Sequence, residues 1–347
     1  MSTIVDVSKK VGVSPATVSC VLNGRASGIA ISPGTRARVL QAVADLGYYR
    51  DEVARAMIHG RLSLIGFAVP SVDREVIGAM MEGMLEAAET GRYFLKVIRV
   101  GSRSGADLAR LGLQYRLAGM ICSQLPDAMV EALHCGLAAR AVPLVVVDNS
   151  APAPWKPCVV SDDPGGERLA IEHLKALGHR RIAYCAYKPR RPWSRRRCDG
   201  FVDAMRGLGL DVRPQWVFKT MADDADWSEV VARFRDTRSR PTAVLCAGDP
   251  AAMVLIRSLR GIGLAVPRDV SVVGFADFAC SRWCDPPLTT IRQPFREMGA
   301  RAMRRLMEAI QPPPAAGGGQ TPGVDSLPTT LVVRGSTAPP PGAGRER

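Results

Sequence analysis

The chain has 347 residues, of which 47% are hydrophobic and 23% charged, so it is long enough for two or three globular domains. No apolar run approaches the length that spans a bilayer, and the first residues lack a signal-peptide pattern. These features argue against a membrane or secreted protein and predict a cytoplasmic one. The formal charge of +13 favours a polyanionic partner, of which nucleic acid is the commonest, although a general preference for arginine would give the same excess.

Side chains suited to catalysis or metal binding show no recognisable pattern. The four histidines lack metal-ligand spacing, and neither a nucleophile elbow nor a phosphate-binding glycine loop is present. The cysteines are scattered, form no CxxC pair and suit buried, reduced thiols: they are residues 20, 122, 135, 158, 185, 198, 246, 280 and 284. We therefore expect no enzyme activity, no metal and no cofactor.

The first stretch of the chain predicts two short helices joined by a tight turn. Thr3 and Asp6 form a capping box that opens the first helix, and Gly12 makes the turn. Ser14 can cap the second helix, and Pro15 fits its first position, where a missing N–H is no loss. Helix, four-residue turn with glycine and second helix form the helix-turn-helix pattern, whose second helix enters the major groove of DNA.

Apolar spacing supports this arrangement and adds a third helix. One side of the second helix is apolar through Val18, Val21 and Leu22. Ser32 is the expected cap of a helix that runs to Leu46, with an apolar stripe of Val39, Leu40, Val43 and Leu46. An amphipathic helix pair in some other all-helical domain is the alternative.

From residue 62 onward, apolar runs rich in β-branched residues alternate with helical periods. We expect strands at 64–70, 94–100, 118–122, 142–148, 158–162, 181–187, 242–248 and 270–275. We expect helices near 76–90, 106–116, 127–140, 165–177, 197–208, 228–237 and 250–262. Continuous apolar strands between helices indicate parallel sheets covered on both faces. The predicted fold is a small all-α helix-turn-helix domain followed by an α/β core of two doubly wound lobes, with a ligand cleft at the carboxyl ends of the strands.

Residues 3–49 resemble the headpiece of the LacI family of bacterial transcriptional regulators. Further matches follow at 172–174, 177–183, 197–201, 266–275 and 286–294, so the resemblance covers 3–337 with an interruption at 311–326 that reads as a flexible loop. It implies a core of the periplasmic-binding-protein type. The implied domains are a headpiece (1–47), a hinge (48–61), a core (62–337) and a disordered tail (338–347). The first lobe is expected to hold 62–157 and 290–325, and the second 158–289 and 326–337.

The same resemblance implies which residues contact DNA. Pro15, Ala16 and Cys20 occupy base-reading positions of the second helix, and Thr17, Ser19 and Asn23 would hold phosphates. The DNA-binding set also includes the capping residue Ser14. In the hinge, Arg55 fits the family pattern, and Met57 stands where an apolar side chain, usually Leu, wedges open the minor groove. A packed side chain is the alternative for Met57.

Residues that face the cleft in the family identify a candidate effector site. Arg197 matches a position that grips a ligand carboxylate or hydroxyl, and Trp227 matches an aromatic that stacks on sugar rings in some members. Further candidates around the same cleft are Asp148, Trp193, Asp249 and Asp277. Two expected polar side chains are replaced by Gly248 and Ala276, which puts an ordinary sugar-hydroxyl network in doubt.

The segment Lys188–Arg197 carries six positive charges beside Trp193, on a loop expected at the rim of the cleft. It is either a solvated basic loop or part of a site for an anionic effector such as a sugar phosphate or sugar acid.

Taken together, the resemblance implies a homodimeric operator-binding regulator, most consistent with a repressor, whose pseudo-palindromic site mirrors the dimer symmetry. An effector bound between the lobes would change their closure, and the hinge would transmit that change to DNA. The implied dimer surface includes Val76–Glu89, Ala251–Leu259 and Ala279–Cys284. The alternative is a carbohydrate-binding receptor without a DNA-binding role, which fits the core but not residues 1–57.

Cys20 generates a specific expectation about the operator. Arginine is common at this position and pairs bidentately with guanine, so its loss removes about 1–3 kcal/mol of base discrimination per half-site. We predict that sequences selected for binding from a random pool lack a preferred guanine at the matching half-site position. Recovery of a strongly preferred guanine there would contradict this prediction.

Overall fold

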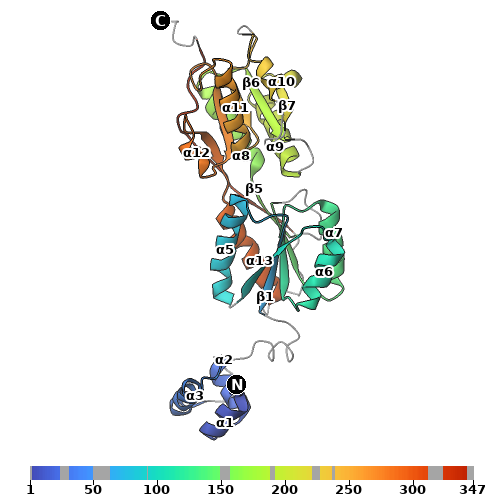
Figure 1. Cartoon of the computed structure of the whole chain (residues 1–347), viewed down its shortest axis with the longest axis vertical. Coiled ribbons are helices and arrows are strands. Elements are labelled where there is room, and N and C mark those ends of the chain that lie inside the picture. Colours follow the sequence, from blue (N-terminus) through green and yellow to red (C-terminus); the bar gives the residue numbers. More distant parts are fainter. Residues whose placement is uncertain are drawn as a thin grey trace. The chain divides into compact units, whose positions relative to one another are not determined.

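The computed structural model describes residues 2–23, 31–49, 63–91, 93–148, 157–187, 192–220, 227–236, 239–311 and 323–341. The chain divides into two compact units, residues 1–62 and 63–347 (Figure 1), and each unit is described by itself. Within the described residues, no helix combines the length and the apolar character needed to cross a membrane.

The first unit contains three helices, α1 (Ile4–Val11), α2 (Pro15–Asn23) and α3 (Pro33–Asp45). Their buried core consists of Val7, Val18, Val21, Val39 and Ala42. Ser32 caps α3 by accepting a hydrogen bond from the Thr35 amide (3.2 Å), as the sequence predicts. The predicted stripe on α3 is wrong at one position, since the Leu40 side chain is 49% exposed.

The first lobe of the second unit is a six-stranded parallel sheet in the order β11-β5-β4-β3-β1-β2. Its strands are β1 (Leu64–Val69), β2 (Phe94–Arg99), β3 (Gly119–Ser123), β4 (Leu144–Val147), β5 (Cys158–Ser161) and β11 (Val324–Leu327). Helices α5 (Glu75–Gly91) and α13 (Phe295–Ile310) cover one face, and α6 (Gly105–Gln114) and α7 (Asp127–Ala138) cover the other (Figure 1).

The second lobe repeats this plan in the order β12-β10-β9-β8-β6-β7, with only β12 antiparallel. Its strands are β6 (Ile182–Tyr187), β7 (Val217–Thr220), β8 (Ala243–Cys246), β9 (Ser271–Ala276), β10 (Thr289–Arg292) and β12 (Thr330–Val332). Helices α8 (Asp163–Ala176) and α9 (Pro192–Gly207) lie on one face, and α10 (Ser228–Ala232) and α11 (Asp249–Gly261) on the other. A short helix, α12 (Cys280–Trp283), follows β9, and a 3-10 turn (Pro214–Trp216) precedes β7.

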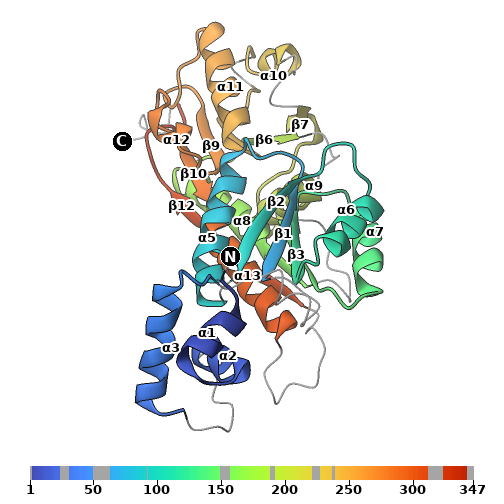
Figure 2. The same ribbon diagram turned by 60° about the horizontal axis from the view of Figure 1, so that its bottom comes forward.

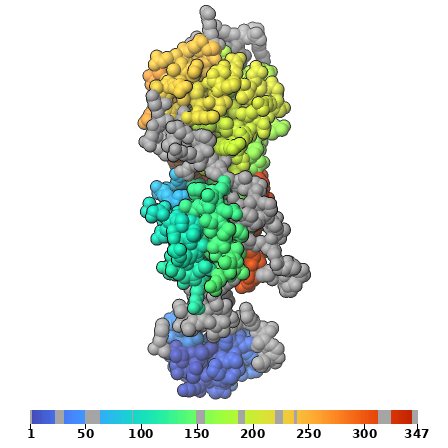
Figure 3. Space-filling model, turned by 90° about the vertical axis from the view of Figure 1, so that its right-hand side faces the viewer, coloured from blue at the N-terminus to red at the C-terminus, as the bar shows by residue number. Residues whose placement is uncertain are grey.

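The predicted fold class is confirmed, because both sheets are built from buried strands flanked by helices on each face. All residues of β3, β4, β5, β8 and β9 are buried, which explains why these segments read as continuous apolar runs. Figure 3 shows the two lobes in space-filling form, with the first in teal to green and the second in yellow to orange.

Three chain segments cross between the lobes. They connect β5 to α8, β10 to α13, and β11 to β12. The predicted lobe boundaries therefore need correction. Residues 158–161 and 324–327 belong to the first sheet, whereas 289–292 belong to the second. These boundaries were wrong because the sequence pattern of an apolar strand does not show to which of the two sheets the strand belongs.

The carboxyl-terminal predictions also need correction. The expected flexible loop at 311–326 includes the first residues of β11, and 312–322 lie outside the described residues. Part of the expected disordered tail is packed. His179 is buried, contacts the Thr242 hydroxyl (2.9 Å) and lies 2.8 Å from the carbonyl oxygen of Ala338. Ala338 is thus held by a buried histidine of the second lobe, and His179 has a structural role.

Helices α5 and α13 lie side by side on the first lobe (Figures 1 and 2), and two glycines allow their close approach. A methyl group at Gly83 would collide with the Arg296 carbonyl oxygen, and one at Gly299 would collide with the Met80 carbonyl oxygen. Backbone thus packs directly on backbone where the α13 crossover enters the first lobe.

This contact predicts opposite effects for two alanine substitutions in α5. Gly83→Ala should destabilise the core by about 1–3 kcal/mol, because the new methyl group pushes α13 away. Gly78→Ala is the control: nothing lies within 4 Å of its added methyl group, so it should stabilise the helix by about 0.5–1 kcal/mol. Urea unfolding of both variants provides the measurement, and similar effects would contradict the proposed packing constraint.

Candidate functional site

The turn between α1 and α2 forms as the sequence predicts. The Thr3 hydroxyl oxygen accepts a hydrogen bond from the Asp6 amide (3.3 Å), while the Thr3 amide donates to the Asp6 carboxylate (2.8 Å). Gly12 has a φ of 72°, and its amide donates to the Ser8 carbonyl oxygen (2.9 Å). The Ser14 hydroxyl oxygen caps α2 by accepting from the Thr17 amide (3.1 Å). This geometry fixes the direction in which α2 leaves the turn.

The predicted DNA-facing residues lie on the outer side of α2. Pro15 and Ala16 are exposed and Thr17, Ser19 and Cys20 half-buried, whereas Val18 is fully buried against α1 and α3. Asn23 ends α2, but the structure does not describe its side chain. The hinge candidates Arg55 and Met57 lie outside the described residues. The described part of the predicted DNA-binding set is therefore presented together by one helix.

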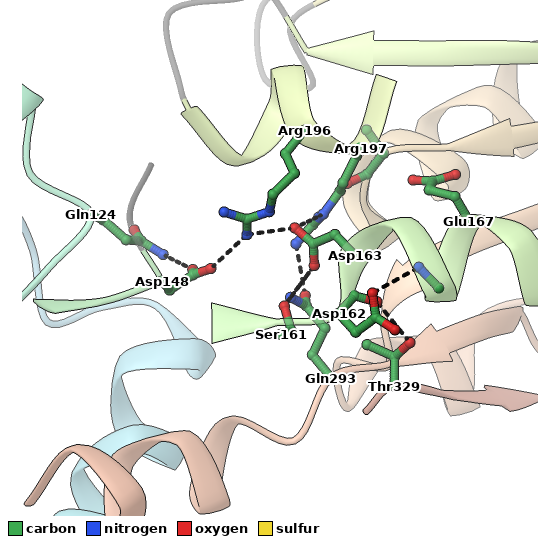
Figure 4. A network of polar contacts seen from close by, with 12 residues as sticks. Gln124, Asp148, Ser161, Asp162, Asp163, Glu167, Arg196, Arg197, Gln293 and Thr329 are labelled. Carbon is green, nitrogen blue, oxygen red and sulfur yellow. Dashed lines mark hydrogen bonds and ion pairs between the residues drawn. The ribbon is translucent and has the colours of Figure 1, made fainter. Parts of the chain in front are cut away.

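At the other predicted site, polar side chains follow the ends of parallel strands. Gln124 comes directly after β3 and Asp148 directly after β4, with φ values of 57° and 49°. Asp163 begins α8, two residues after β5. Because the carboxyl ends of these strands meet at one edge of the first sheet, the three side chains gather where the chain crosses to the second lobe (Figure 4).

Asp163 is the centre of this polar network. It is completely buried, and one carboxylate oxygen accepts from the Ser161 hydroxyl (2.6 Å) and the Gln293 amide (3.2 Å). The other oxygen accepts from Arg196 (2.8 Å) and lies 3.3 Å from Nε of Arg197. Asp163 lies in the crossover from β5 to α8, and Gln293 lies in the crossover from β10 to α13. Their hydrogen bond therefore links these two crossovers.

The third crossover is attached through the neighbouring residue. The Asp162 amide donates to the Leu327 carbonyl oxygen (2.7 Å), and the Thr329 hydroxyl donates to the Asp162 carbonyl oxygen (3.2 Å). All three crossovers are therefore joined by hydrogen bonds within a few residues of one another (Figure 4). The three connections between the lobes are thus held together as one hydrogen-bonded unit.

Arg197 is buried and directed toward its own lobe. It donates to the Ala247 carbonyl oxygen (2.7 Å) and to the Gln293 side-chain oxygen (2.9 Å). Its guanidinium also lies over the rings of Trp193 (4.7 Å) and Phe275 (4.1 Å). Burial alone would lower the pKa of Arg197, but the nearby carboxylates, Asp163 foremost, outweigh burial and raise it. Arg197 therefore remains charged and has a structural role, because its contacts join α9 to Ala247, Gln293 and Asp163.

Arg196 is directed toward the first lobe instead. Its guanidinium lies 2.8 Å from Asp163 and 4.0 Å from the Asp148 carboxylate, which belongs to the first lobe. Asp148 accepts only a long hydrogen bond from Gln124 (3.5 Å), and its Oδ1 atom has no hydrogen-bond partner although it is buried. The Gln124 side-chain oxygen is likewise buried and unpartnered. Two buried acceptors therefore lie at the junction of the lobes without hydrogen-bond donors.

Two buried acids at this place, Asp148 and Glu167, bind protons more tightly than usual. Burial, and then the charge of Asp163, raise the pKa of Asp148 to about 6. Burial also raises the pKa of Glu167 well above its ordinary value, and Glu167 accepts a hydrogen bond from the Tyr184 hydroxyl (3.1 Å). The charge of Asp148 consequently changes near neutral pH.

The structure separates three predicted effector residues from this cluster. Trp227 is buried in the apolar core formed by α10, α11 and their strands. Asp249 accepts from the Thr290 hydroxyl (2.6 Å) and the Phe278 amide (2.8 Å), so both its oxygens serve the second lobe. Asp277 is held by Arg292 (2.7 Å) and Arg334 (2.5 Å). Of the six candidates, only Asp148, Trp193 and Arg197 come together.

Sequence reasoning missed the other members of the network, which are Gln124, Ser161, Asp163, Arg196 and Gln293. A usable signal existed for Ser161 and Asp163, because polar residues that directly follow a buried parallel strand lie at the ligand-binding edge of its sheet. Nothing in the sequence distinguishes Arg196 from its arginine neighbours. Only the fold shows which one faces the cleft.

The structure also contains a hollow of about 490 Å³ beside this network, and Gln293 belongs to both. It lies between α5, the first turns of α13 and the segment that precedes α12, with Ala79, Phe278 and Phe295 among its lining residues. Within the described part of the chain, no group of three or more His, Cys, Asp or Glu side chains is arranged to hold a metal ion.

The chain is similar to known protein families and to known proteins. Residues 3–51 match the family model of bacterial regulatory proteins, lacI family, and residues 171–337 match that of the periplasmic binding protein-like domain. The chain is 33% identical to the HTH-type transcriptional regulator MalR of Streptomyces coelicolor, over 98% of this chain and 97% of that protein.

Two solved structures are similar over nearly the whole chain. A lac repressor dimer bound to operator and the anti-inducer ONPF has a TM-score of 0.79 and 28% identity, covering 97% of this chain and 99% of its own. A complex of the transcriptional regulator CelR with cellobiose has a TM-score of 0.67 and 27% identity, covering 97% and 100%.

The raised pKa of Asp148 predicts a pH-dependent cost to folding. A carboxyl whose pKa is about 6 in the folded chain and about 3.9 when unfolded binds protons more tightly in the folded state, so stability falls as pH rises between these values. Asp148→Asn removes this effect, and at pH 7 it should be more stable than the native chain by on the order of 3 kcal/mol. Urea unfolding from pH 4 to 7.5 measures the difference, which should vanish near pH 4. Parallel curves for the two proteins would contradict the prediction.

Proposed function

Because this chain belongs to the lacI family of bacterial regulatory proteins, we propose that a neutral, polyhydroxylated effector bound beside Asp148 controls its operator affinity. The chain is a DNA-binding transcriptional regulator, and its function fits that of a repressor. The relatives are regulators rather than enzymes. A transport receptor remains a poor alternative, since it would have no use for the α1–α2 pair.

DNA recognition is assigned to the outer side of α2. Pro15 and Ala16 offer only apolar contact, which suits thymine methyl groups in the major groove. Phosphate contacts are assigned to Ser14, Thr17, Ser19 and Asn23, with Arg55 and Met57 acting in the minor groove. Exposed basic residues at Lys9, Lys10, Arg36 and Arg38 give the headpiece the charge that phosphate binding needs.

The chemistry of the effector follows from the two unpartnered acceptors. Oδ1 of Asp148 and the side-chain oxygen of Gln124 are buried without a hydrogen-bond partner. Each oxygen has therefore lost its hydrogen bonds to water without gaining one from the protein. Hydroxyl groups of a ligand can donate to both oxygens. This single observation carries the proposal of a polyol or sugar. The cellobiose bound by the similar regulator CelR belongs to the same chemical class.

An anionic effector is less compatible with the charges around the cleft. Of the six positive side chains in Lys188–Arg197, the structure describes three, and each faces a carboxylate. Arg195 lies 3.7 Å from Asp199, while Arg196 and Arg197 share Asp163. An added negative group would also meet Asp148 and Asp163. We therefore favour a neutral ligand over the sugar phosphate or sugar acid that the sequence left open.

Lobe closure is the proposed link between effector and operator. The effector would contact Gln124 and Asp148 of the first lobe and Arg196 of the second, so binding favours one angle between the lobes. The crossover network would carry that change to the first strand after the hinge. By linkage, operator binding must alter effector affinity by the same factor.

The dimer surface is proposed to run over α5 and α12, as the sequence resemblance implies. Trp283 on α12 is 85% exposed, and Leu85 on α5 is 44% exposed. Both helices contribute to the lining of the hollow described above, through Ala79 of α5 and Arg282 of α12. A second copy of the chain is the partner that would cover them.

Operator release is the direct test of the effector site. A mobility shift on promoter DNA should show that a neutral sugar, screened in matched pairs with its acid or phosphate, releases the bound chain. Asp148→Ala should still bind operator, but half-release should require at least tenfold more sugar, because a charged hydrogen-bond acceptor is lost. Release by only the acidic member of a pair would count against a neutral effector. An unchanged response of Asp148→Ala would refute the site.

Trp283→Asp tests the proposed dimer surface. A charge in place of the exposed indole should weaken self-association at least tenfold in sedimentation equilibrium, and operator affinity should fall with it. Val333→Asp is the control, because Val333 is 57% exposed but lies beyond β12, outside the predicted surface. Equal association of the two variants would place the dimer contact elsewhere.

A further inference from the structure

We propose that Glu75 is a positioning residue that biases the angle between the two lobes, through a direct hydrogen bond outside the crossovers. Glu75 begins α5 of the first lobe, and its carboxylate oxygens accept from the backbone amide of Ala279 in the second lobe (2.9 and 3.1 Å). The two residues are 204 positions apart in the chain. This role deepens the proposed function, on which its effect on operator release rests.

Two apolar side chains of the second lobe pack on the first lobe beside this hydrogen bond. Ala276 ends β9, yet it is buried in the apolar cluster that α5 and α13 form on the first sheet. The ring of Phe278 stacks on the ring of Phe295, which begins α13, with the two centroids 6.2 Å apart. We call residues 276–279 the lobe bridge, because they join the second lobe to both helices.

The second lobe holds the lobe bridge from the other side. The Phe278 amide donates to the Asp249 carboxylate (2.8 Å). Asp277 forms ion pairs with Arg292 (2.7 Å) and Arg334 (2.5 Å). These contacts lie within one lobe, so they keep the bridge on the second lobe when the angle between the lobes changes. Such a change therefore acts on the hydrogen bond to α5.

The backbone of the lobe bridge is strained. Ala276 has a φ of 126°, a value that residues other than glycine rarely adopt, and the next residue, Asp277, has a φ of 57°. Strained conformations persist where the surrounding contacts determine them. The contacts to both lobes hold the bridge in this conformation, so the loss of one of them favours a relaxed arrangement.

Space beside the lobe bridge leaves room for the lobes to move. The hollow of about 490 Å³ is lined by Ala79 and Phe295 of the first lobe and by Phe278 and Arg282 of the second. Close-packed interiors resist displacement, whereas a hollow between two walls can widen or narrow. The hydrogen bond from Glu75 spans the lobes next to this hollow. It can therefore favour one lobe angle over another.

Three variants of the full chain test this role. Glu75→Ala removes the acceptor, and Glu75→Gln keeps an oxygen acceptor at the same place. Glu131→Ala is the control, because Glu131 is an exposed glutamate of α7, on the other face of the first sheet. Hydrogen exchange at the Ala279 amide should be roughly two- to tenfold faster in Glu75→Ala, because its hydrogen bond is lost. The other two variants should exchange like the native chain.

Operator release provides the readout of the lobe angle. With cellobiose and ribose as probes, the sugar concentration that half-releases operator should shift roughly two- to tenfold in Glu75→Ala. It should stay native in Glu75→Gln and Glu131→Ala. A lower concentration assigns the lobe bridge to the operator-bound angle, and a higher one assigns it to the effector-bound angle. Self-association in sedimentation equilibrium should not change, since Glu75 acts within one chain.

Three results would overturn the role of Glu75. The first is unchanged exchange at the Ala279 amide in Glu75→Ala. The second is faster exchange with an unchanged half-release concentration, because the hydrogen bond would then not bias the lobe angle. The third is weaker self-association of Glu75→Ala, because a dimer contact would then explain the shift. If neither sugar releases operator from the native chain, the proposed effector class fails, and hydrogen exchange still decides whether Glu75 joins the lobes.

Discussion

The arrangement of the core depends on the buried carboxylate of Asp163. A fully buried charge is tolerated only when donors and opposite charges surround it, and here Ser161, Gln293, Arg196 and Arg197 supply them. These partners come from two crossovers and from α9, so satisfying one charge fixes the relative position of three chain segments. The same requirement keeps Arg197 buried in contact with Asp163. Asp148 lies at the border of this network, and its Oδ1 atom has no hydrogen-bond donor.

Local signals made much of the fold predictable. Caps, a glycine turn and apolar spacing act over a few residues, so the helix-turn-helix could be derived with its details, including the Ser14 cap. Buried parallel strands read as apolar runs, so most strands of both lobes were found. Among the missed elements, α13 carries a clear helical stripe at Phe295, Met298, Ala302 and Leu306, and its period alone could have located it. The strands β7 and β10 are four residues each, too short for a clear period.

The effector site was predictable only in part, because its members come from five separate segments. Sequence position placed Asp148 and Arg197 near the cleft, but burial and hydrogen bonding decide what each can do. In the structure, Arg197 forms buried hydrogen bonds to Ala247 and Gln293, and Trp227 packs in an apolar core. Six neighbouring positive charges suggested an anionic ligand as one alternative. One compensating carboxylate, Asp163, lies far from this segment in the chain, where no local pattern reveals it. The other, Asp199, follows Arg195 at i+4, so helical spacing alone could have paired the two.

The central claim is that the crossover network couples the cleft to DNA. Effector affinity of the native chain, measured by calorimetry with and without operator duplex, should differ by a factor well above one. Gln293→Ala, which cuts the link between two crossovers, should bring that factor close to one while effector and operator still bind separately. An undiminished factor in Gln293→Ala would contradict the claim, because the lobes would then communicate without the network.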